Sequence, residues 1–593
     1  MAKKEKQKMH IISTLSKSIR EYKLPSILSP LSISLEVLME VLIPTFMASL
    51  IDKGINQGNM SEVLKIGGIL VIFCLFSLTG GTLSAKFGAD ASCGFAKNLR
   101  HDMYYKVQDY SFSNIDKFST ASLVTRMTTD VTNVQNAYQM MIRIAVRAPL
   151  MLIFSLIMSF RINAKLSLLF LIVMPVLAVG LILIMNHAHP IFKKVFKLYD
   201  KLNNVVQENL RGIRVVKSYV REDHEVEKFN KVSEKIYEGF SKAEKTLAVN
   251  GPLMQFCMYT ATLLLSWFGA KMIVSSGGSE LTVGMLQSLI TYTAQILMSF
   301  MMLSMIFVMI TMSRASAERI CEVLQEQSDI TDPENPVYEV KDGSITFENV
   351  DFSYSKRGDK KCLDNINLKI ESGQTIGIIG GTGSSKSSLV QLIPRLYDVT
   401  AGKITVGGVD VRDYDIHALR NAVAMVLQKN ELFSGTIKSN LKWGDENATD
   451  EQIEHASKLA QADPFIQEFE DKYDTTIEQG GTNVSGGQKQ RICIARALLK
   501  HPKILILDDS TSAVDTKTDS LIQSAFREEI PDTTKIIIAQ RISSVEKADK
   551  IIVLDDGKIN GFGSHDELIK TNEIYREVYE SQTKKSDKKG GEE

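Results

Sequence analysis

The segment Thr375-Ile376-Gly377-Ile378-Ile379-Gly380-Gly381-Thr382-Gly383-Ser384-Ser385-Lys386-Ser387 joins an apolar strand to a helix through a glycine-rich turn. In a turn of this kind the backbone N–H groups point at phosphates, and the dipole of the following helix adds favourable charge. Lys386 would reach the outer phosphates, and the Ser387 hydroxyl would ligate Mg²⁺. The segment departs from the pattern G-x-x-x-x-G-K-[ST] at one position, because Ser385 stands where the pattern has glycine.

This segment predicts a site for ATP and Mg²⁺. The residues expected to form its phosphate loop are Gly380, Gly381, Thr382, Gly383, Ser384, Ser385, Lys386, Ser387 and Ser388. The alternative interpretation is a glycine-rich turn without a ligand. We disfavour it because further motifs of a nucleotide site follow in the expected order along the chain. The apolar run Ile504-Leu505-Ile506-Leu507 ends in Asp508, an acid suited to Mg²⁺, and Asp509 comes next. A later run, Ile536-Ile537-Ile538-Ala539, leads to Gln540.

Length and composition narrow the class of protein. At 593 residues the chain is too long for a single core, so several domains are expected. Its charge is balanced, with 69 Lys and Arg against 69 Asp and Glu, which gives no electrostatic footprint for nucleic acid. The 6 cysteines are scattered without metal-ligand spacing, so reduced thiols are expected. The basic amino terminus is not followed by a short apolar run with a cleavage site, and a cleaved signal peptide is not expected.

Six apolar segments before residue 315 approach the length of about 20 residues that crosses a bilayer. Their expected spans are 24–51, 63–88, 142–160, 165–186, 252–275 and 281–312. In the third, Arg143, Arg147 and Arg161 leave a short uncharged core, and a buried soluble helix is the alternative. The last contains no charged residue or histidine from Leu281 to Ser313. The sequence therefore predicts an all-α membrane domain with six transmembrane helices.

The loops between these segments alternate in length. The links at 52–62, 161–164 and 276–280 are short, whereas those at 89–141 and 187–251 are long and predict helices that project into water. The second long loop is rich in Lys and Arg, which marks the cytoplasmic side. An even number of spans then places both the amino terminus and the carboxyl-terminal half in the cytoplasm, in a multi-pass protein of the plasma (cell inner) membrane.

From about residue 330 the pattern changes to short apolar runs separated by charged, helix-like stretches. This alternation predicts an α/β domain with helices on the faces of a sheet. The expected organisation is a transmembrane domain (1–325), a linker (326–338), a nucleotide-binding domain with a helical subdomain (339–580) and a disordered tail (581–593).

In combination these motifs resemble the ABC transporter family, and in particular exporter half-transporters in which six membrane helices precede one ATP-binding cassette. Tyr354 matches the aromatic residue that stacks on adenine, and Gln428 matches the glutamine that touches Mg²⁺ and faces the membrane domain. Val484-Ser485-Gly486-Gly487-Gln488 matches the signature loop, with valine in place of the usual leucine. Ser512-Ala513-Val514-Asp515 resembles the loop that communicates between two ATP sites. Taken alone, Tyr354 would better suit an ordinary strand tyrosine, and Gln428 would equally suit a solvated residue just past a strand. The signature loop and the loop at Ser512–Asp515 could each be a simple turn.

The resemblance implies a dimer in which two cassettes enclose two nucleotides, so that Ser485, Gly486, Gly487 and Gln488 act on the ATP of the partner. By this resemblance, two further residues depart from the family's pattern. Asp509 stands where a catalytic glutamate is usual, and Gln540 stands where a histidine is usual. Misplacement of a reacting group by about 1 Å can reduce a rate about 100-fold, and loss of a general base about 10²- to 10⁴-fold. This chain's own site is therefore predicted to hydrolyse ATP poorly, while its signature loop is intact.

That asymmetry resembles the degenerate-site subunit of heterodimeric bacterial multidrug exporters, with a second half-transporter as partner. A homodimeric exporter with slow ATPase is the near alternative, and an ATP-gated channel or sensor is the alternative from another class. The expected cargo is a small hydrophobic or amphipathic molecule, with multidrug export as the default for this resemblance.

Several residues of the predicted membrane domain allow two interpretations. Glu36 and Glu40 share a helical face inside the first span, and they would either attract a cationic substrate or pair with Arg143 or Arg147. Methionines recur on the sixth span, at 298, 301, 302, 305, 309 and 312, where an adaptable apolar cavity, helix packing or lipid contact would explain them. In the long loops, residues 113–118 and 217–220 lie where such exporters have short coupling helices, with solvated loop as the alternative.

Overall fold

The computed structural model describes residues 11–354, 361–510 and 514–589. The chain divides into two compact units. Unit 1 comprises residues Met1–Gln108 and Thr120–Glu326, and unit 2 comprises Asp109–Ser119 and Gln327–Glu593. The boundary between them lies at the start of the linker expected at 326–338.

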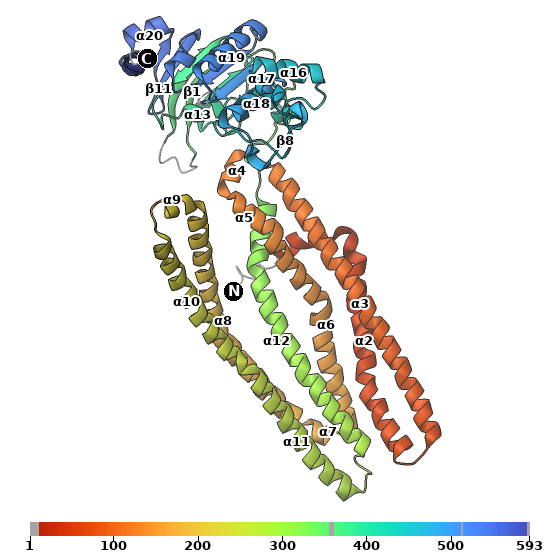
Figure 1. Cartoon of the computed structure of the whole chain (residues 1–593). Coiled ribbons are helices and arrows are strands. Elements are labelled where there is room, and N and C mark those ends of the chain that lie inside the picture. Colours follow the sequence, from red (N-terminus) through yellow and green to blue (C-terminus); the bar gives the residue numbers. More distant parts are fainter. Residues whose placement is uncertain (1–10, 355–360, 511–513, 590–593) are drawn as a thin grey trace. The chain divides into compact units, whose positions relative to one another are not determined.

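Unit 1 is built from long helices joined by short turns (Figure 1). Their bounds are α2 (Lys23–Ser49), α3 (Met60–Gln108), α5 (Thr120–Thr125), α6 (Val131–Ile162), α7 (Ala164–Ser167), α8 (Phe170–Arg211), α9 (Ile213–Ser218), α10 (Glu222–Ala248), α11 (Asn250–Ser276) and α12 (Val283–Gln325). Six helical stretches in the described part of the chain are long and apolar enough to cross a membrane. They are Ile11–Ile55, Met60–Gln108, Thr120–Ile162, Ala164–Phe192, Glu222–Ser276 and Val283–Gln325. The six predicted spans, including the third, are confirmed.

The long loops are helical, as predicted. With 49 residues, α3 is about 73 Å long, more than twice the ~30 Å hydrocarbon core of a bilayer. Helices α8 and α10 likewise continue beyond the apolar segments and meet at the short helix α9, which contains Lys217 (Figure 1). The six transmembrane helices therefore extend into the cytoplasm.

Close packing between α2 and α3 depends on small residues. A Cβ at Gly80 would lie 3.0 Å from the Ser32 carbonyl oxygen and 3.1 Å from the Glu36 backbone nitrogen. Because the backbones approach this closely, Glu36 is held inside the helix pair, with 15% of its side chain exposed.

A single cation joins the two acidic residues of the first span. Arg147 on α6 donates from Nη1 to Glu36 Oε1, and from Nη2 to Glu40 Oε2 at 2.6 Å. The structural pairing considered from the sequence is therefore present, and Arg147 is the partner. Three charges at this depth stabilise one another where each alone would be costly.

Unit 2 contains three sheets. The four-stranded sheet has the order β2-β1-β4-β5, the six-stranded sheet β12-β11-β3-β10-β9-β6, and the two-stranded sheet β7-β8. The strands are β1 (Ile345–Phe352), β2 (Leu363–Ile370), β3 (Thr375–Ile379), β4 (Ala401–Val406), β5 (Val409–Asp410), β6 (Val423–Val426), β7 (Gly435–Thr436), β8 (Thr476–Ile477), β9 (Ile504–Asp508), β10 (Thr534–Ile538), β11 (Lys550–Asp555) and β12 (Lys558–Gly563). The helices are α4 (Phe112–Lys117), α13 (Lys386–Gln391), α14 (Ile416–Ala422), α15 (Ile437–Leu441), α16 (Asp450–Leu459), α17 (Asp463–Gln467), α18 (Gly486–Leu498), α19 (Thr516–Glu529), α20 (His565–Thr571) and α21 (Glu573–Lys589).

The six-stranded sheet is buried on both faces. Along β9, Ile504 and Ile506 join one hydrophobic cluster, whereas Leu505 and Leu507 join the other. Strands of a parallel sheet covered on both sides are apolar throughout, which is why this run reads as continuous Ile and Leu. The predicted α/β fold class is confirmed.

The segment 109–119 belongs to unit 2 although its neighbours in sequence belong to unit 1. Helix α4 begins with a capping box between Ser111 and Asn114. The Asn114 side chain donates to the Gln327 carbonyl oxygen at 3.0 Å, and the Ser111 hydroxyl donates to Asp329 at 3.2 Å. This segment, expected as a coupling helix, is thus attached to the first residues of the carboxyl-terminal half.

The last helix differs from the sequence prediction. A disordered tail was expected from residue 581, whereas α21 runs from Glu573 to Lys589. The predicted tail is charged but contains few helix breakers before Gly590, so its composition also suits a solvated helix.

The Arg147 pair gives a stability prediction. Arg147→Met should lower the free energy of unfolding of the full chain by on the order of 3 kcal/mol, because it leaves two carboxylates together without their cation. Thermal or denaturant unfolding in detergent measures this loss. The control is the triple variant Arg147→Met, Glu36→Gln, Glu40→Gln, which removes all three charges and should recover most of it. Equal stability of Arg147→Met and the unaltered chain would contradict the pairing.

Candidate nucleotide-binding site

Four adjacent parallel strands bring the predicted site residues to one edge of the six-stranded sheet. Strands β3, β10, β9 and β6 are parallel neighbours in that order. The phosphate loop follows β3, Gln540 follows β10, Asp509 follows β9 and Gln428 follows β6. Ligands of open α/β sheets bind outside the carboxyl ends of the strands, so the fold gathers these segments where a nucleotide is expected.

The phosphate loop wraps around the lysine ammonium group. Lys386 Nζ donates to the Gly380 and Gly381 carbonyl oxygens, each at 2.8 Å, and lies 3.3 Å from Ser384 Oγ. Burial lowers the pKa of Lys386, while Asp508 and Asp509 oppose that shift. The group therefore sits between backbone oxygens and two acids, ready to meet the added negative charge of phosphates.

Ser385 adopts a conformation that favours glycine. Its φ is 70°, in the left-handed region, at the residue that precedes α13. The pattern requires glycine at this position for a physical reason, because a residue with a side chain pays about 1 kcal/mol or more to adopt a left-handed backbone conformation. Gly383, with φ 86°, supplies the other left-handed residue of the loop. The serine is accommodated with Lys386 and Ser387 still in place, so the loop keeps both groups expected to bind ATP and Mg²⁺.

Ser387 and Asp508 form the expected metal pair. The Ser387 hydroxyl donates to Asp508 Oδ1 at 3.0 Å. Asp508 is only 4% exposed, and burial raises the pKa of its carboxyl, with Asp509 adding to the shift. Among the described residues no group of three or more His, Cys, Asp or Glu could hold a metal alone. The Ser387 and Asp508 oxygens would suit Mg²⁺, which typically takes one or two protein oxygens and completes its shell with phosphates and water.

The two departures at the strand ends contact each other. Gln540 Nε2 donates to Asp509 Oδ2 at 2.7 Å, and Gln428 also hydrogen-bonds to the Asp509 carboxylate. The Asp509 backbone N–H donates to the Ile538 carbonyl oxygen at 3.1 Å, which fixes β9 against β10 at this level. Burial raises the pKa of Asp509, and the two amide hydrogen bonds oppose that shift. The Asp509 side chain is thus one methylene shorter than that of glutamate, and its carboxylate is buried and hydrogen-bonded to two neutral side chains.

Tyr354, the expected adenine-stacking residue, is half-exposed and held from several sides. Its hydroxyl lies 2.9 Å from Ser388 Oγ and donates to Gln391 Oε1 at 3.3 Å, both on α13. Its ring makes edge contacts with Phe352 at 4.7 Å and Tyr397 at 5.1 Å between centroids. Burial raises the pKa of the Tyr354 hydroxyl. The ring is therefore fixed beside the helix that begins at the phosphate loop.

The signature loop is exposed at the start of α18. Ser485 is the N-cap of this 13-residue helix, where its hydroxyl accepts from the Gln488 backbone N–H and its own N–H donates to Gln488 Oε1 at 2.9 Å. Ser485 and Gly486 are exposed, and Gly487 and Gln488 are half-buried. An exposed N-terminus of a 13-residue helix is a suitable anion site, as the predicted contact with a partner's nucleotide requires.

The predicted communicating loop is described only in part. Residues Ser512 and Ala513 of the predicted communicating loop lie outside the described residues. Asp515, at the end of that loop, is the N-cap of α19 and accepts from the Thr518 backbone N–H.

Tyr397 is a residue that the sequence reasoning missed. Its hydroxyl donates to Asp116 of α4 at 2.6 Å, and its ring contacts Phe112 of the same helix at 6.0 Å. Because Tyr397 also contacts Tyr354, one residue joins the expected coupling helix to the expected adenine site. The motif scan had no reason to select it, since Tyr397 acts only through contacts that the fold creates.

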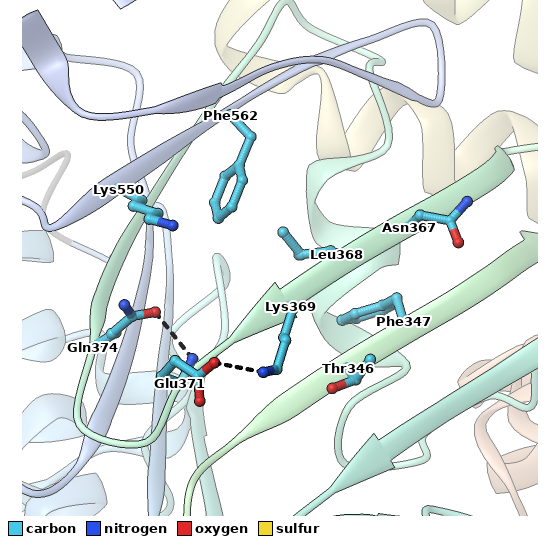
Figure 2. Close-up of a pocket in the computed structure, with 9 residues that line it drawn as sticks. All are labelled: Thr346, Phe347, Asn367, Leu368, Lys369, Glu371, Gln374, Lys550 and Phe562. Carbon is cyan, nitrogen blue, oxygen red and sulfur yellow. Dashed lines mark hydrogen bonds and ion pairs between the residues drawn. The ribbon is translucent and has the colours of Figure 1, made fainter. Parts of the chain in front are cut away.

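A second hollow in unit 2 is unrelated to this site. This groove has a volume of about 410 Å³ and includes the Lys369–Glu371 ion pair (2.8 Å) and Lys550 over the Phe562 ring (4.9 Å). Figure 2 shows the residues that line it. Its lining residue Gln374 precedes β3, whereas the phosphate loop follows that strand. The groove is therefore at the other end of β3 from the predicted nucleotide site.

Comparisons with known proteins agree with this arrangement. A family model described as the ABC transporter transmembrane region matches residues 26–300, and one described as ABC transporter matches residues 363–512. The uncharacterized ABC transporter ATP-binding protein YfiB of Bacillus subtilis (strain 168) is 36% identical over 92% of this chain and 94% of its own length. The ATP-dependent lipid A-core flippase of Desulfotalea psychrophila (strain LSv54 / DSM 12343) is 34% identical over 82% of this chain and 84% of its own length.

A solved structure, that of a bacterial Atm1-family ABC exporter with ATP bound, shares the fold. It aligns over 95% of this chain and 98% of its own, with a TM-score of 0.80 and 23% identity. The six spans, the fused cassette and these relatives agree on one architecture, with the ATP-binding domain in the cytoplasm. The chain belongs to the ABC transporter family and is a half-transporter, a multi-pass membrane protein in which six membrane helices precede one ATP-binding cassette.

Proposed function

We propose that this chain is the degenerate-site half of a heterodimeric exporter. Its own site binds ATP and Mg²⁺ but hydrolyses ATP poorly, while its signature loop completes the competent site of a second half-transporter. In this scheme ATP closes the two cassettes and reorients the membrane helices, and hydrolysis at the partner's site resets them. The cargo is a small lipophilic or amphipathic molecule.

The observation that carries the proposal is the hydrogen bond from Gln540 to Asp509. A general base must face the nucleophile with a free lone pair, and its pKa must suit proton transfer. The carboxylate of Asp509 is one methylene shorter than that of glutamate, and amides of Gln540 and Gln428 donate to it. Retraction of about 1 Å is itself sufficient to slow a reaction about 100-fold.

Gln540 contributes to the same impairment. An amide can donate a hydrogen bond to a phosphate, but it carries no positive charge and cannot exchange a proton as an imidazole does. Because one of its N–H groups is directed at Asp509, the side chain is also held toward the protein. The two departures support each other structurally, which is the arrangement expected of a site specialised for binding.

The site retains the groups expected to bind ATP and Mg²⁺. Lys386 lies among the loop carbonyls, Ser387 and Asp508 present oxygen ligands suited to Mg²⁺, and Tyr354 offers a half-exposed ring. When bound, Mg²⁺ would neutralise phosphate charge. The exposed Ser485 at the start of α18 favours an exporter over an ATP-gated channel or sensor, because an intact signature loop is needed to complete a partner's catalytic site.

The isolated chain provides the first test. We expect the purified chain to bind ATP with Mg²⁺ but to release phosphate at least roughly 100-fold more slowly than the complete transporter, because the base is misplaced. Equilibrium nucleotide binding and steady-state phosphate release measure the two properties. Lys386→Ala is the control, since loss of binding in that variant assigns the nucleotide to this phosphate loop. Turnover by the isolated chain near the rate of the complex would contradict the proposal.

The adenine contact gives a second test. Tyr354→Ala should weaken ATP binding to the isolated chain roughly tenfold, because an aromatic face that stacks on a base contributes about 1–3 kcal/mol. Tyr354→Phe is the matched control, because it keeps the ring and removes only the hydroxyl contacts with Ser388 and Gln391. Its affinity should stay close to that of the unaltered chain. An unchanged affinity of Tyr354→Ala would show that another group holds the base.

The third test separates the two ATP sites of the assembled complex. Ser485→Asp keeps an N-cap for α18, because Asp and Ser cap equally well, but directs a negative charge at the partner's γ-phosphate. Steady-state ATPase activity should fall roughly 100-fold or more. Asp509→Asn should change it little, because that carboxylate contributes little to the transition state.

The order of the two effects distinguishes the alternatives. Equal and severe loss in Ser485→Asp and Asp509→Asn would indicate a homodimer with two identical sites. A severe loss only in Asp509→Asn would mean that the competent site belongs to this chain. No hydrolysis in the unaltered complex would favour a channel or sensor.

A further inference from the structure

Unit 1 contains an apolar pocket of about 300 Å³ in which methionine predominates. Met301, Met305 and Met309 recur every four residues along one face of α12, and Met140 of α6 and Met185 of α8 complete the set. The sequence left open whether the methionines of the sixth span line a cavity or merely pack. Met301, Met305 and Met309 line a pocket, so the cavity interpretation applies to that face.

Methionine makes this pocket adaptable. Its side chain has three rotatable bonds and a polarizable sulfur, which contacts aromatic rings favourably. Met301 and Met305 are 42% and 57% exposed, so the side of the pocket formed by α12 is accessible. A volume of about 300 Å³ is at the lower end of the range for small-molecule sites.

The pocket has one unsatisfied polar atom. Asn250, the first residue of α11, lines the pocket, and its Oδ1 is buried and accepts no hydrogen bond from any described residue. A buried acceptor without a donor costs about 1–3 kcal/mol. An N–H or O–H group of a bound molecule would supply the missing donor.

The remaining lining and the position of the pocket define the ligand class. No lining residue carries a charge, so the pocket offers no counter-ion to an ionic molecule. On α12 the lining residues lie about 27–39 Å from the helix start at Val283, which is near the cytoplasmic boundary of a ~30 Å hydrocarbon core. An amphipathic molecule in the inner leaflet would meet the pocket at this depth.

We propose that this pocket binds cargo, in the form of neutral aromatic molecules with one N–H or O–H donor directed at Asn250. The inference rests on the proposed export function, since a pocket among membrane helices receives cargo only in a transporter. It also distinguishes this site from the Glu36–Arg147–Glu40 group, whose acids already have a cation.

The test uses N-phenyl-1-naphthylamine, a neutral aromatic fluorophore with one N–H group, and its N-methyl derivative, which lacks the donor. The full chain is placed in lipid nanodiscs without nucleotide, and empty nanodiscs give the background of lipid partitioning. Saturable binding of the N–H probe is expected, with the N-methyl probe roughly fivefold to tenfold weaker. Asn250→Leu should weaken the N–H probe by that factor and abolish the difference between the two probes.

A steric variant tests the location. Ser304 lines the pocket, so Ser304→Phe should fill it and remove saturable binding. Ile310→Phe is the matched control, because Ile310 is an exposed residue of the same helix that does not line the pocket. It should bind the probe as the unaltered chain does. Unchanged binding in Ser304→Phe, or an unchanged preference for the N–H probe in Asn250→Leu, would overturn the proposal.

Failure of the proposed function is distinguishable from failure of this inference. The binding measurement involves neither nucleotide nor the partner chain, so brisk ATP hydrolysis by the isolated chain would refute the degenerate site and leave the probe result unaffected. In the complete transporter the N–H probe should stimulate ATPase activity, and Ser304→Phe should remove the stimulation whereas Ile310→Phe should keep it. Stimulation that persists in Ser304→Phe would also overturn the pocket assignment.

Discussion

The parallel pairing of β3, β10, β9 and β6 is the constraint on which the cassette depends. In this register Ile538 lies opposite Asp508, so the residues that follow the two strands are neighbours although about 30 positions separate them in sequence. Polar residues can lie at or just after the carboxyl ends of these strands because the two faces of the sheet, and not the strand ends, are covered by apolar side chains. The same pairing that allows Ser387 to meet Asp508 therefore also brings Gln540 to Asp509.

A comparable constraint acts in the membrane unit, where every charge needs a partner. Arg147 shortens the uncharged part of the third span. In the structure it forms ion pairs with Glu36 and Glu40, which connect α6 to α2. Since the three charges pair with one another, they stabilise the packing of α2 against α6. The Met-rich pocket is the contrasting case, because Asn250 Oδ1 in its lining accepts no hydrogen bond from any described residue.

The sequence predicted the parts of the fold that follow from local pattern and length. Apolar runs located six spans, and the alternation after residue 330 indicated the α/β domain, because burial of whole strands leaves a continuous signal in β9. The motif residues of the site were found because phosphate binding requires particular residues at fixed spacing. Contacts between distant segments left no such signal: Glu36 and Glu40 had two possible roles and two candidate partners, and Tyr397 had no expected role until its contacts with α4 were seen. Beyond residue 581, composition alone did not separate a solvated helix from disorder.

The contacts of Tyr397 indicate how the ATP site would remain useful if it is slow, as proposed. Tyr354 is in contact with Tyr397, and Tyr397 donates to Asp116 of the helix expected to couple the cassette to the membrane. This route begins at the ring expected to stack on the base, whereas Asp509 and Gln540 lie at the strand ends expected to face the outer phosphates. Neither Asp509 nor Gln540 belongs to this set of contacts. Under the proposed function, the contacts from Tyr354 to α4 would therefore respond to a bound nucleotide and would not require hydrolysis at Asp509.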